Sequence, residues 1–142
     1  MRNNIQIEKT SDIRIGINSG IIKKFAGKIA DNEIYCNYKI NIIFVDNKYI
    51  VELNKKFFKK NDTTDVISFK LSEEDDEVLE GEIYISIEQV RGQSKEYSVG
   101  YREELLRIVA HGILHIADYK DDTEKNRKEM FEKQENYLKT II

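Results

Sequence analysis

The chain is organised around the segment His111-Gly112-Ile113-Leu114-His115-Ile116-Ala117-Asp118-Tyr119-Lys120-Asp121. It contains both histidines of the chain, and their spacing of four residues places the two side chains on one face of a helix, one turn apart. Asp121 follows beyond the expected end of that helix, where a turn of the chain can bring its carboxylate to the same place. Zinc accepts two imidazoles and a carboxylate, and three protein ligands leave one position open, as in catalytic zinc sites.

The histidine pair alone is weak evidence for a metal, because any exposed helix can carry two histidines at this spacing. A third ligand ten residues after His111 strengthens the prediction, since it repeats the ligand spacing of H-E-x-x-H-x-x-G-x-x-H metallohydrolases, with aspartate in place of the last histidine. Gly112, however, stands where those enzymes carry the glutamate that acts as general base. The sequence therefore disfavours a zinc peptidase.

Length and composition predict a single domain over residues 1–142, because 142 residues with 40% hydrophobic content can bury one core but not two ordinary ones. The first residues lack the apolar segment of a signal peptide, and no stretch is long enough to span a bilayer. We therefore expect a cytoplasmic protein without a membrane partner. Cys36 is the one cysteine, so neither an internal disulfide nor a cysteine metal cluster is expected.

Alternating and helical apolar patterns predict an α+β fold, an α/β sandwich with a mixed sheet of about four strands and about five helices. Strands are expected over residues 5–7, 38–45, 66–69 and 82–87. Helices are expected over residues 19–30, from a cap at Asp46 to about 57, from 86 or 88 to 95, over 101–117, and from a cap at Thr123 onward. The core candidates of the second and last helices are Tyr49, Ile50, Leu53, Phe57, Met130, Phe131, Tyr137 and Leu138. The metal site would lie on the central helix and the turn after it, and the acidic run 72–77 reads as a solvated loop.

Charge is distributed unevenly along the chain, whose net charge is −3. Residues 1–70 carry 13 Lys/Arg and 8 Asp/Glu, whereas residues 71–142 carry 10 and 18. The basic half contains the run Lys55-Lys56-Phe57-Phe58-Lys59-Lys60. Such a run suits a single-stranded RNA backbone with a base stacked on an aromatic ring, and it equally suits a helix end with Phe57 in the core and lysines near the negative end of the helix dipole. Both interpretations stay open on the sequence.

Three blocks of the sequence together resemble one family, the YbeY-type endoribonucleases, which are single-domain bacterial metalloproteins of ribosomal RNA maturation. Residues 111–121 are similar to the family signature H-G-x-L-H-L-x-G-Y-D-H. Leu53-Asn54 followed by Thr64-Asp65-Val66-Ile67-Ser68-Phe69 is similar to L-N…P-T-D-V-L-S-F, and Gly81-Glu82-Ile83-Tyr84-Ile85-Ser86 to G-D-I-x-I-S. Met130 also stands nine residues after Asp121, as in that family. The resemblance therefore covers residues 53 to about 135.

The resemblance implies one zinc ion per chain, bound by the catalytic residues His111, His115 and Asp121, the last at a position that is histidine in the family. It implies a zinc-dependent, single-strand-specific endoribonuclease that acts in maturation of the 16S rRNA 3′ end and in ribosome quality control. The implied partners are rRNA and the small ribosomal subunit, and we expect the RNA to be bound by Lys55, Lys56, Phe58, Lys59 and Lys60.

The chain departs from the family pattern at three further positions. Phe58 stands where many members carry arginine, which can hold phosphate through two hydrogen bonds, and Lys59 or Lys60 would replace its charge but not its geometry. Asp118 replaces a glycine of the turn, which predicts a left-handed residue there under strain. Gln134 stands where glutamate is usual, so an ionic role at that position is in doubt.

The general base is left open among Asp65, Ser68, Glu104 and Tyr119, which could instead be a cap, a strand residue, a solvated helix residue and a packing aromatic. Two other functions also stay open. One is a ribosome-associated RNA-binding factor with a structural zinc and little hydrolysis. The other is a metal-dependent hydrolase of a small ester or peptide, against which the missing motif glutamate argues.

Overall fold

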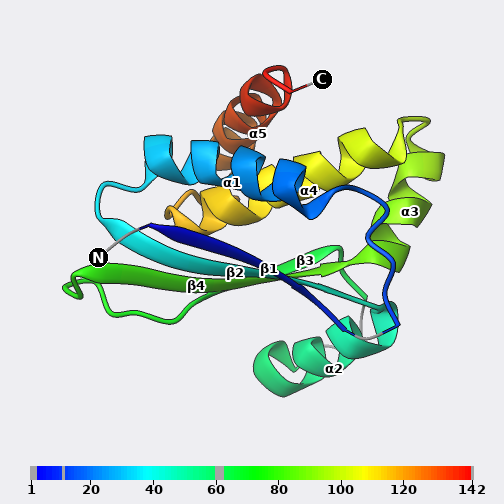
Figure 1. Ribbon diagram of the computed structural model, residues 1–142, viewed down its shortest axis with the longest axis horizontal. Helices are drawn as coiled ribbons and strands as arrows, with labels where there is room; N and C mark the ends of the chain where they lie inside the picture. Colours follow the sequence, from blue (N-terminus) through cyan, green and yellow to red (C-terminus); the bar gives the residue numbers. More distant parts are fainter. Residues whose placement is uncertain (1–2, 11, 60–62, 142) are drawn as a thin grey trace.

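A sheet with helices on both faces organises the described part of the chain, residues 3–10, 12–59 and 63–141 of a computed structural model (Figure 1). Its strands are β1 (Asn4–Lys9), β2 (Asn37–Val45), β3 (Val66–Lys70) and β4 (Val78–Ser86). The spatial order is β1-β2-β4-β3, in which β1, β2 and β4 run parallel and β3 is the antiparallel edge strand. The predicted four-stranded mixed sheet is confirmed.

Helices form two unequal layers around this sheet (Figure 1). α1, α4 and α5 lie on one face, α2 lies on the other, and α3 stands at one end. Their bounds are α1 (Ser19–Glu33), α2 (Asn47–Phe58), α3 (Ile87–Glu96), α4 (Tyr101–Ile116) and α5 (Glu124–Leu138). The described residues thus give the α+β sandwich with five helices that the sequence predicts. No helix among them is both long and apolar enough to cross a membrane.

Strand β2 shows why both faces of the sheet are covered. Ile40, Ile42 and Phe44 are buried in the large core under α1 and α4, while the alternate residues Ile43 and Val45 are buried in a smaller cluster under α2. Because successive side chains of a strand point to opposite faces, the continuous apolar run of β2 requires a helical layer on each side. The sheet is therefore the middle layer of the fold.

Side-chain caps begin four of the five helices in the described chain. Asn18, Asp46, Ser86 and Thr123 each accept a hydrogen bond from a backbone N–H in the first turn of the following helix. The caps at Asp46 and Thr123 confirm the sequence prediction. Strand β4 is longer than the predicted 82–87, because its first residues pair with β2 from Asn37 onward, a partner that lies far away in sequence.

Two glycines allow α4 to lie directly against the sheet. A Cβ atom added at Gly112 would meet Cγ2 of Ile83 at 2.7 Å, and one added at Gly81 would meet Cδ1 of Ile116 at 2.8 Å. Both distances are shorter than carbon atoms tolerate, so the contact between α4 and β4 depends on glycine at both positions. Since Gly112 faces the sheet, no side chain at this position could act as the base of a zinc peptidase.

Four predicted environments are wrong. Tyr49, a core candidate of α2, is 41% exposed. Phe131 is 56% exposed, because Met130, Gln134 and Leu138 form the buried stripe of α5. Phe57 is 53% exposed and meets Phe69 edge-on, so it is not a core residue.

Glu104 is the fourth error, since it is buried rather than solvated. Its carboxylate accepts a hydrogen bond from Arg107 at 2.8 Å, which compensates the charge.

Candidate metal centre

His111, His115 and Asp121 bring their ligand atoms together at the end of α4. The two Nε2 atoms lie 3.0 Å apart, and Oδ2 of Asp121 lies 3.3 Å from Nε2 of His115 and 4.0 Å from Nε2 of His111. The side chains of the histidines are 29% and 27% exposed, and that of Asp121 is 50% exposed. The predicted triad is therefore a real cluster that is open to solvent on the aspartate side.

The turn after α4 delivers Asp121 to the histidines. Backbone N–H groups of Asp118 and Tyr119 bond to the carbonyls of His115 and Leu114, which closes the last turn of the helix. Asp118 has φ 73°, the left-handed conformation that the sequence predicted at this position. Its carboxylate accepts from Nζ of Lys70 at 2.9 Å, so an edge strand holds the turn in place.

The spacing of the ligand atoms fits one metal ion. A tetrahedral zinc about 2.0–2.2 Å from nitrogen and oxygen ligands separates those ligands by about 3.3–3.6 Å. The three donor atoms lie within 4.8 Å of one another, with the two shorter separations near this range. Two imidazoles and one carboxylate also match the donor types that zinc favours. The residues present therefore fit a zinc ion with one coordination position left for solvent or substrate.

Each imidazole is oriented through its other nitrogen. Nδ1 of His111 lies 2.9 Å from Oε1 of Gln134, and Nδ1 of His115 lies 3.1 Å from the carbonyl oxygen of Tyr119. Partners of this kind hold a ligand histidine in the orientation that the metal needs. The sequence had marked Gln134 only as a departure from glutamate. Its place on the buried stripe with Met130 and Leu138 was the available signal that it points inward.

Burial lowers the pKa of His111 below its ordinary value, and the neighbouring His115 lowers it further, whereas the hydrogen bond with Gln134 opposes the shift. A neutral imidazole is the form that binds metal. The environment of His111 therefore favours the ligand form before any metal arrives.

The triad opens into a cleft between α2, α4 and β3 whose wall includes Asn54, Phe58, Asp65, Ser68 and Lys70. Two candidates for the general base, Asp65 and Ser68, line this cleft. Oδ2 of Asp65 accepts from the amide of Gln93 at 3.2 Å, and the hydroxyl of Ser68 donates to the carbonyl of Gly112 at 3.3 Å.

The other two candidates for the base are engaged in different contacts. The carboxylate of Glu104 binds Arg107, and the hydroxyl of Tyr119 donates to Glu33 at 2.7 Å. Neither residue is part of the cleft wall. Asp65 is thus the candidate with a carboxylate in the cleft.

The predicted RNA-binding residues divide into two groups. Phe58 is 48% exposed, stacks on Phe69 with ring centroids 5.9 Å apart, and lines the cleft. Lys55 and Lys56 are exposed in the last turn of α2, and Lys59 caps that helix. Lys60 lies outside the described residues.

Asn54 and Lys70 are cleft residues that the sequence analysis missed. Asn54 stands in the motif block Leu53-Asn54, and it is buried although asparagine is usually exposed. Lys70 directly follows the block that ends at Phe69, so the position of that block was the available signal.

Comparison with known proteins decides the family. The family model described as "Endoribonuclease YbeY" matches residues 4–142. This chain belongs to the YbeY endoribonuclease family. The resemblance predicted from the three sequence blocks is thereby confirmed.

Individual YbeY relatives agree with this assignment. The chain is 41% identical over 101 residues to the endoribonuclease YbeY of Flavobacterium psychrophilum, and the aligned region covers 71% of each protein. It is 43% identical over 106 residues to that of Thermotoga neapolitana, covering 74% of this chain and 68% of the other. A solution structure of TM1509 from Thermotoga maritima has a TM-score of 0.67 and 36% identity, covering 95% of this chain and 87% of that one.

Two of the three YbeY motif blocks converge on the cleft. The end of α2 with Asn54, the start of β3 with Asp65 and the α4 histidines all line the same cleft. Because these residues lie far apart in the sequence and yet line one cleft, the cleft is the place to look for the activity after which the relatives are named.

Proposed function

We propose that this chain is a zinc-dependent endoribonuclease whose reaction takes place in the cleft beside His111, His115 and Asp121. The observation that carries the proposal is the convergence of three ligand atoms within 4.8 Å at the wall of a cleft that also contains a carboxylate, Asp65. The relatives are named endoribonucleases, which supplies the substrate class. When bound, zinc would act as a Lewis acid on a phosphodiester oxygen and lower the pKa of water.

Residues of the cleft supply the other requirements of hydrolysis. Asp65, held by the amide of Gln93, would accept the proton of the attacking water. Ser68 keeps its hydroxyl on the backbone of α4 and so positions β3 against the metal-binding helix. Lys70 supplies an ammonium group in the cleft wall, a charge that Phe58 cannot supply. This ammonium pairs with Asp118 at 2.9 Å, so it would have to turn from that carboxylate to meet phosphate.

Single-stranded RNA is the form of substrate that this surface suits. Phe58 presents a half-exposed ring beside the cleft, on which an unpaired base could stack, whereas bases in a duplex are already stacked on one another. The exposed Lys55, Lys56 and Lys59 offer charge for the phosphate backbone. We further propose, from the family resemblance, that the substrate is rRNA of the small ribosomal subunit, matured at the 16S 3′ end and monitored in ribosome quality control.

A cleavage assay on purified single-stranded and duplex RNA tests this function. The wild-type protein should cut single strands, lose activity with a chelator and regain it with zinc. His115→Ala, prepared in parallel, serves as the control for contaminating nucleases, and Asp65→Asn should retain zinc but lose most of the rate. Wild-type protein that cuts single-stranded RNA no faster than His115→Ala does would contradict the proposal.

The two other candidate functions would appear as distinct outcomes of the same assay. RNA that is bound with zinc present but never cut would indicate an RNA-binding factor with a structural zinc. Zinc-dependent cleavage of a small ester or peptide, without cleavage of RNA, would indicate the other hydrolase. The open coordination position favours a catalytic metal over a structural one.

A further inference from the structure

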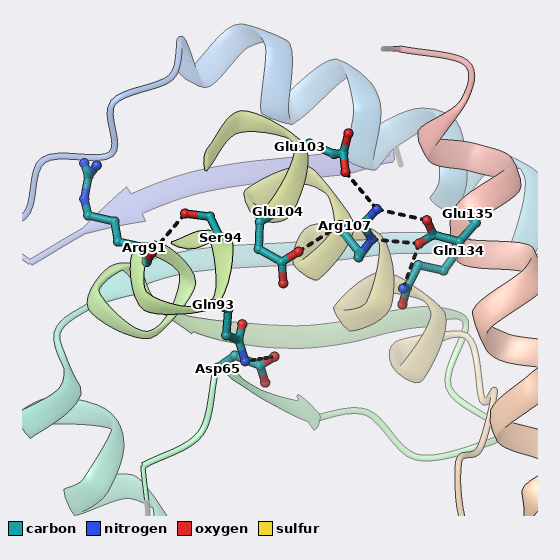
Figure 2. Close-up of polar contacts among 9 residues, drawn as sticks. All are labelled: Asp65, Arg91, Gln93, Ser94, Glu103, Glu104, Arg107, Gln134 and Glu135. Carbon is teal, nitrogen blue, oxygen red and sulfur yellow. Dashed lines mark hydrogen bonds and ion pairs between the residues drawn. The ribbon is translucent and has the colours of Figure 1, made fainter. Parts of the chain in front are cut away.

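A chain of polar side chains runs from Arg107 on α4 to Glu135 and Gln134 on α5 (Figure 2). Gln134 in turn contacts His111. Arg107 donates to Glu135 through two nitrogens, from Nε to Oε2 at 2.8 Å and from Nη2 to Oε1 at 3.0 Å. The same guanidinium also binds Glu104 at 2.8 Å and Glu103 at 3.1 Å. A bidentate contact of this kind fixes both the position and the plane of the Glu135 carboxylate. Hydrogen bonding by Arg107 also holds the pKa of Glu135 below its ordinary value, so the carboxylate stays ionised.

The Gln134 amide has one possible orientation in this chain. An ionised carboxylate accepts hydrogen bonds and donates none, so the amide group that faces Oε2 of Glu135 at 3.2 Å must be the Nε2 donor. Figure 2 shows this contact between neighbouring residues of α5. The amide oxygen is consequently directed at Nδ1 of His111, 2.9 Å away. Gln134 is buried, with 5% of its surface exposed, so solvent cannot easily take over either role.

An amide oxygen is only an acceptor, which makes Nδ1 of His111 the protonated nitrogen of its neutral ring. The other ring nitrogen, Nε2, then carries the lone pair, and it is the atom that faces His115 at 3.0 Å. We propose that Arg107 and Glu135 are positioning residues of the metal centre, which fix the tautomer of His111 through the Gln134 amide. This inference rests on the proposed zinc site, because His111 can bind zinc through Nε2 only when that nitrogen is unprotonated.

His115 does not need such a chain. Its Nδ1 lies 3.1 Å from the carbonyl oxygen of Tyr119, and a backbone carbonyl can only accept. His111 instead depends on a side-chain amide, which could present either its oxygen or its nitrogen. The Arg107–Glu135 pair removes this ambiguity, which gives the pair a role at the metal centre although neither residue is a ligand.

The test compares Glu135→Gln with the matched control Glu103→Gln. Both variants remove one carboxylate from Arg107, but only Glu135 touches Gln134. Imidazole ¹⁵N NMR of the metal-free protein reads the tautomer directly. His111 should be Nδ1-protonated in the wild type and in Glu103→Gln, and should become a mixture of tautomers in Glu135→Gln. Zinc affinity should fall about tenfold or more in Glu135→Gln, and it should be unchanged in Glu103→Gln.

Exchanging the residues at positions 134 and 135 distinguishes a change of tautomer from a general loss of protein stability. In the double variant Gln134→Glu with Glu135→Gln, the new carboxylate at position 134 can only accept, so it should restore the Nδ1-protonated form of His111 and the zinc affinity. A single tautomer in Glu135→Gln identical to that of the wild type, or a double variant that fails to restore it, would overturn the inference. The tautomer is read without metal or RNA, so a failure of RNA cleavage would not be mistaken for a failure of this proposal.

Discussion

Tyr119 donates a hydrogen bond from its hydroxyl to Oε1 of Glu33 at 2.7 Å, which joins the turn between the metal ligands to the end of α1. Glu33 also accepts from the hydroxyl of Tyr137 and pairs with Lys133 at 3.5 Å. The Glu33 side chain is 9% exposed. One nearly buried carboxylate therefore ties the metal-binding turn to two helices.

Replacing Glu33 by glutamine should destabilise the protein by roughly 1–3 kcal/mol at neutral pH. Burial by itself would raise the pKa of Glu33, but the hydrogen bonds from Tyr137 and Tyr119 outweigh it and hold the pKa below its ordinary value. With a depressed folded pKa, the stabilisation is present above the ordinary glutamate pKa and is lost as the pH falls through the folded pKa. Urea unfolding should thus show a gap between wild type and variant that closes in acid. A gap that is constant with pH would contradict the ionic role, and Glu132→Gln, exposed on α5, is the control.

Substitutions of Asp121 should show whether zinc binding depends on the position of the third ligand or on its being a carboxylate. Asp121→His should retain zinc, because the turn places either side chain beside the two imidazoles, whereas Asp121→Ala should bind zinc at least about tenfold more weakly. Metal-binding titrations of both variants give the comparison. Asp122→Ala, in the same turn but outside the ligand group, is the matched control. Equal affinity in wild type and Asp121→Ala would remove this carboxylate from the site.

The close contact of α4 with the sheet predicts that Gly112→Ala is harmful although alanine favours helices. The added Cβ would lie 2.7 Å from Cγ2 of buried Ile83, so a net loss of roughly 1 kcal/mol or more is expected after the gain in helix propensity. Gly92→Ala, in α3 with nothing within 4 Å of the added atom, should instead stabilise by up to about 1 kcal/mol. Thermal unfolding measures both. Equal effects of the two substitutions would show that α4 can retreat from the sheet.

Titration of metal-free protein should show His111 losing its proton at a lower pH than an ordinary histidine. Burial lowers the pKa of His111, and a free imidazole titrates near about 6.5. The NMR signals of His111, assigned with His111→Ala, should therefore have a midpoint below that value. His111 would then already be a competent ligand where an exposed histidine is half protonated. A midpoint at or above about 6.5 would contradict the effect of burial.

RNA binding should depend on salt through the exposed lysines of α2. Lys56→Ala with Lys59→Ala should weaken binding similarly for different single-stranded sequences and flatten the dependence on salt by up to about 0.7 log unit for each lost phosphate contact. Zinc content should stay the same. Lys125→Ala with Lys128→Ala on exposed positions of α5 is a control of equal charge. An unchanged slope in the α2 variant would place the RNA contact elsewhere.

Features that depend on neighbouring residues were predictable from the sequence. The two histidines share a helix face by spacing alone, Asp46 and Thr123 cap the helices that follow them, and Asp118 adopts the expected left-handed conformation. Each of these follows from interactions within a few residues. Local chemistry therefore predicted the cluster of His111, His115 and Asp121 and most element boundaries.

Features that depend on distant residues were not predictable in this way. Periodicity placed Phe57 and Phe131 on apolar helix faces, yet the other elements of the fold leave more than half of each residue exposed. Glu104 looked solvated, although its partner Arg107 is only three residues away on α4, because its burial depends on the other helices that pack against α4. When a side chain is buried by residues that are distant in the sequence, the residues next to it in the sequence do not indicate that burial.

Gly112 fixes α4 to the sheet, and this makes the three ligands unequal in what a mutation can change. His111 and His115 belong to a helix whose backbone is held against β4, so moving either one disturbs the core. Asp121 stands on a turn with half of its side chain in solvent, where a different ligand can replace it without repacking. The proposed metal centre thus combines two ligand positions that are tied to folding with a third on an exposed turn, so a substitution at Asp121 can change the metal preference without disturbing the core.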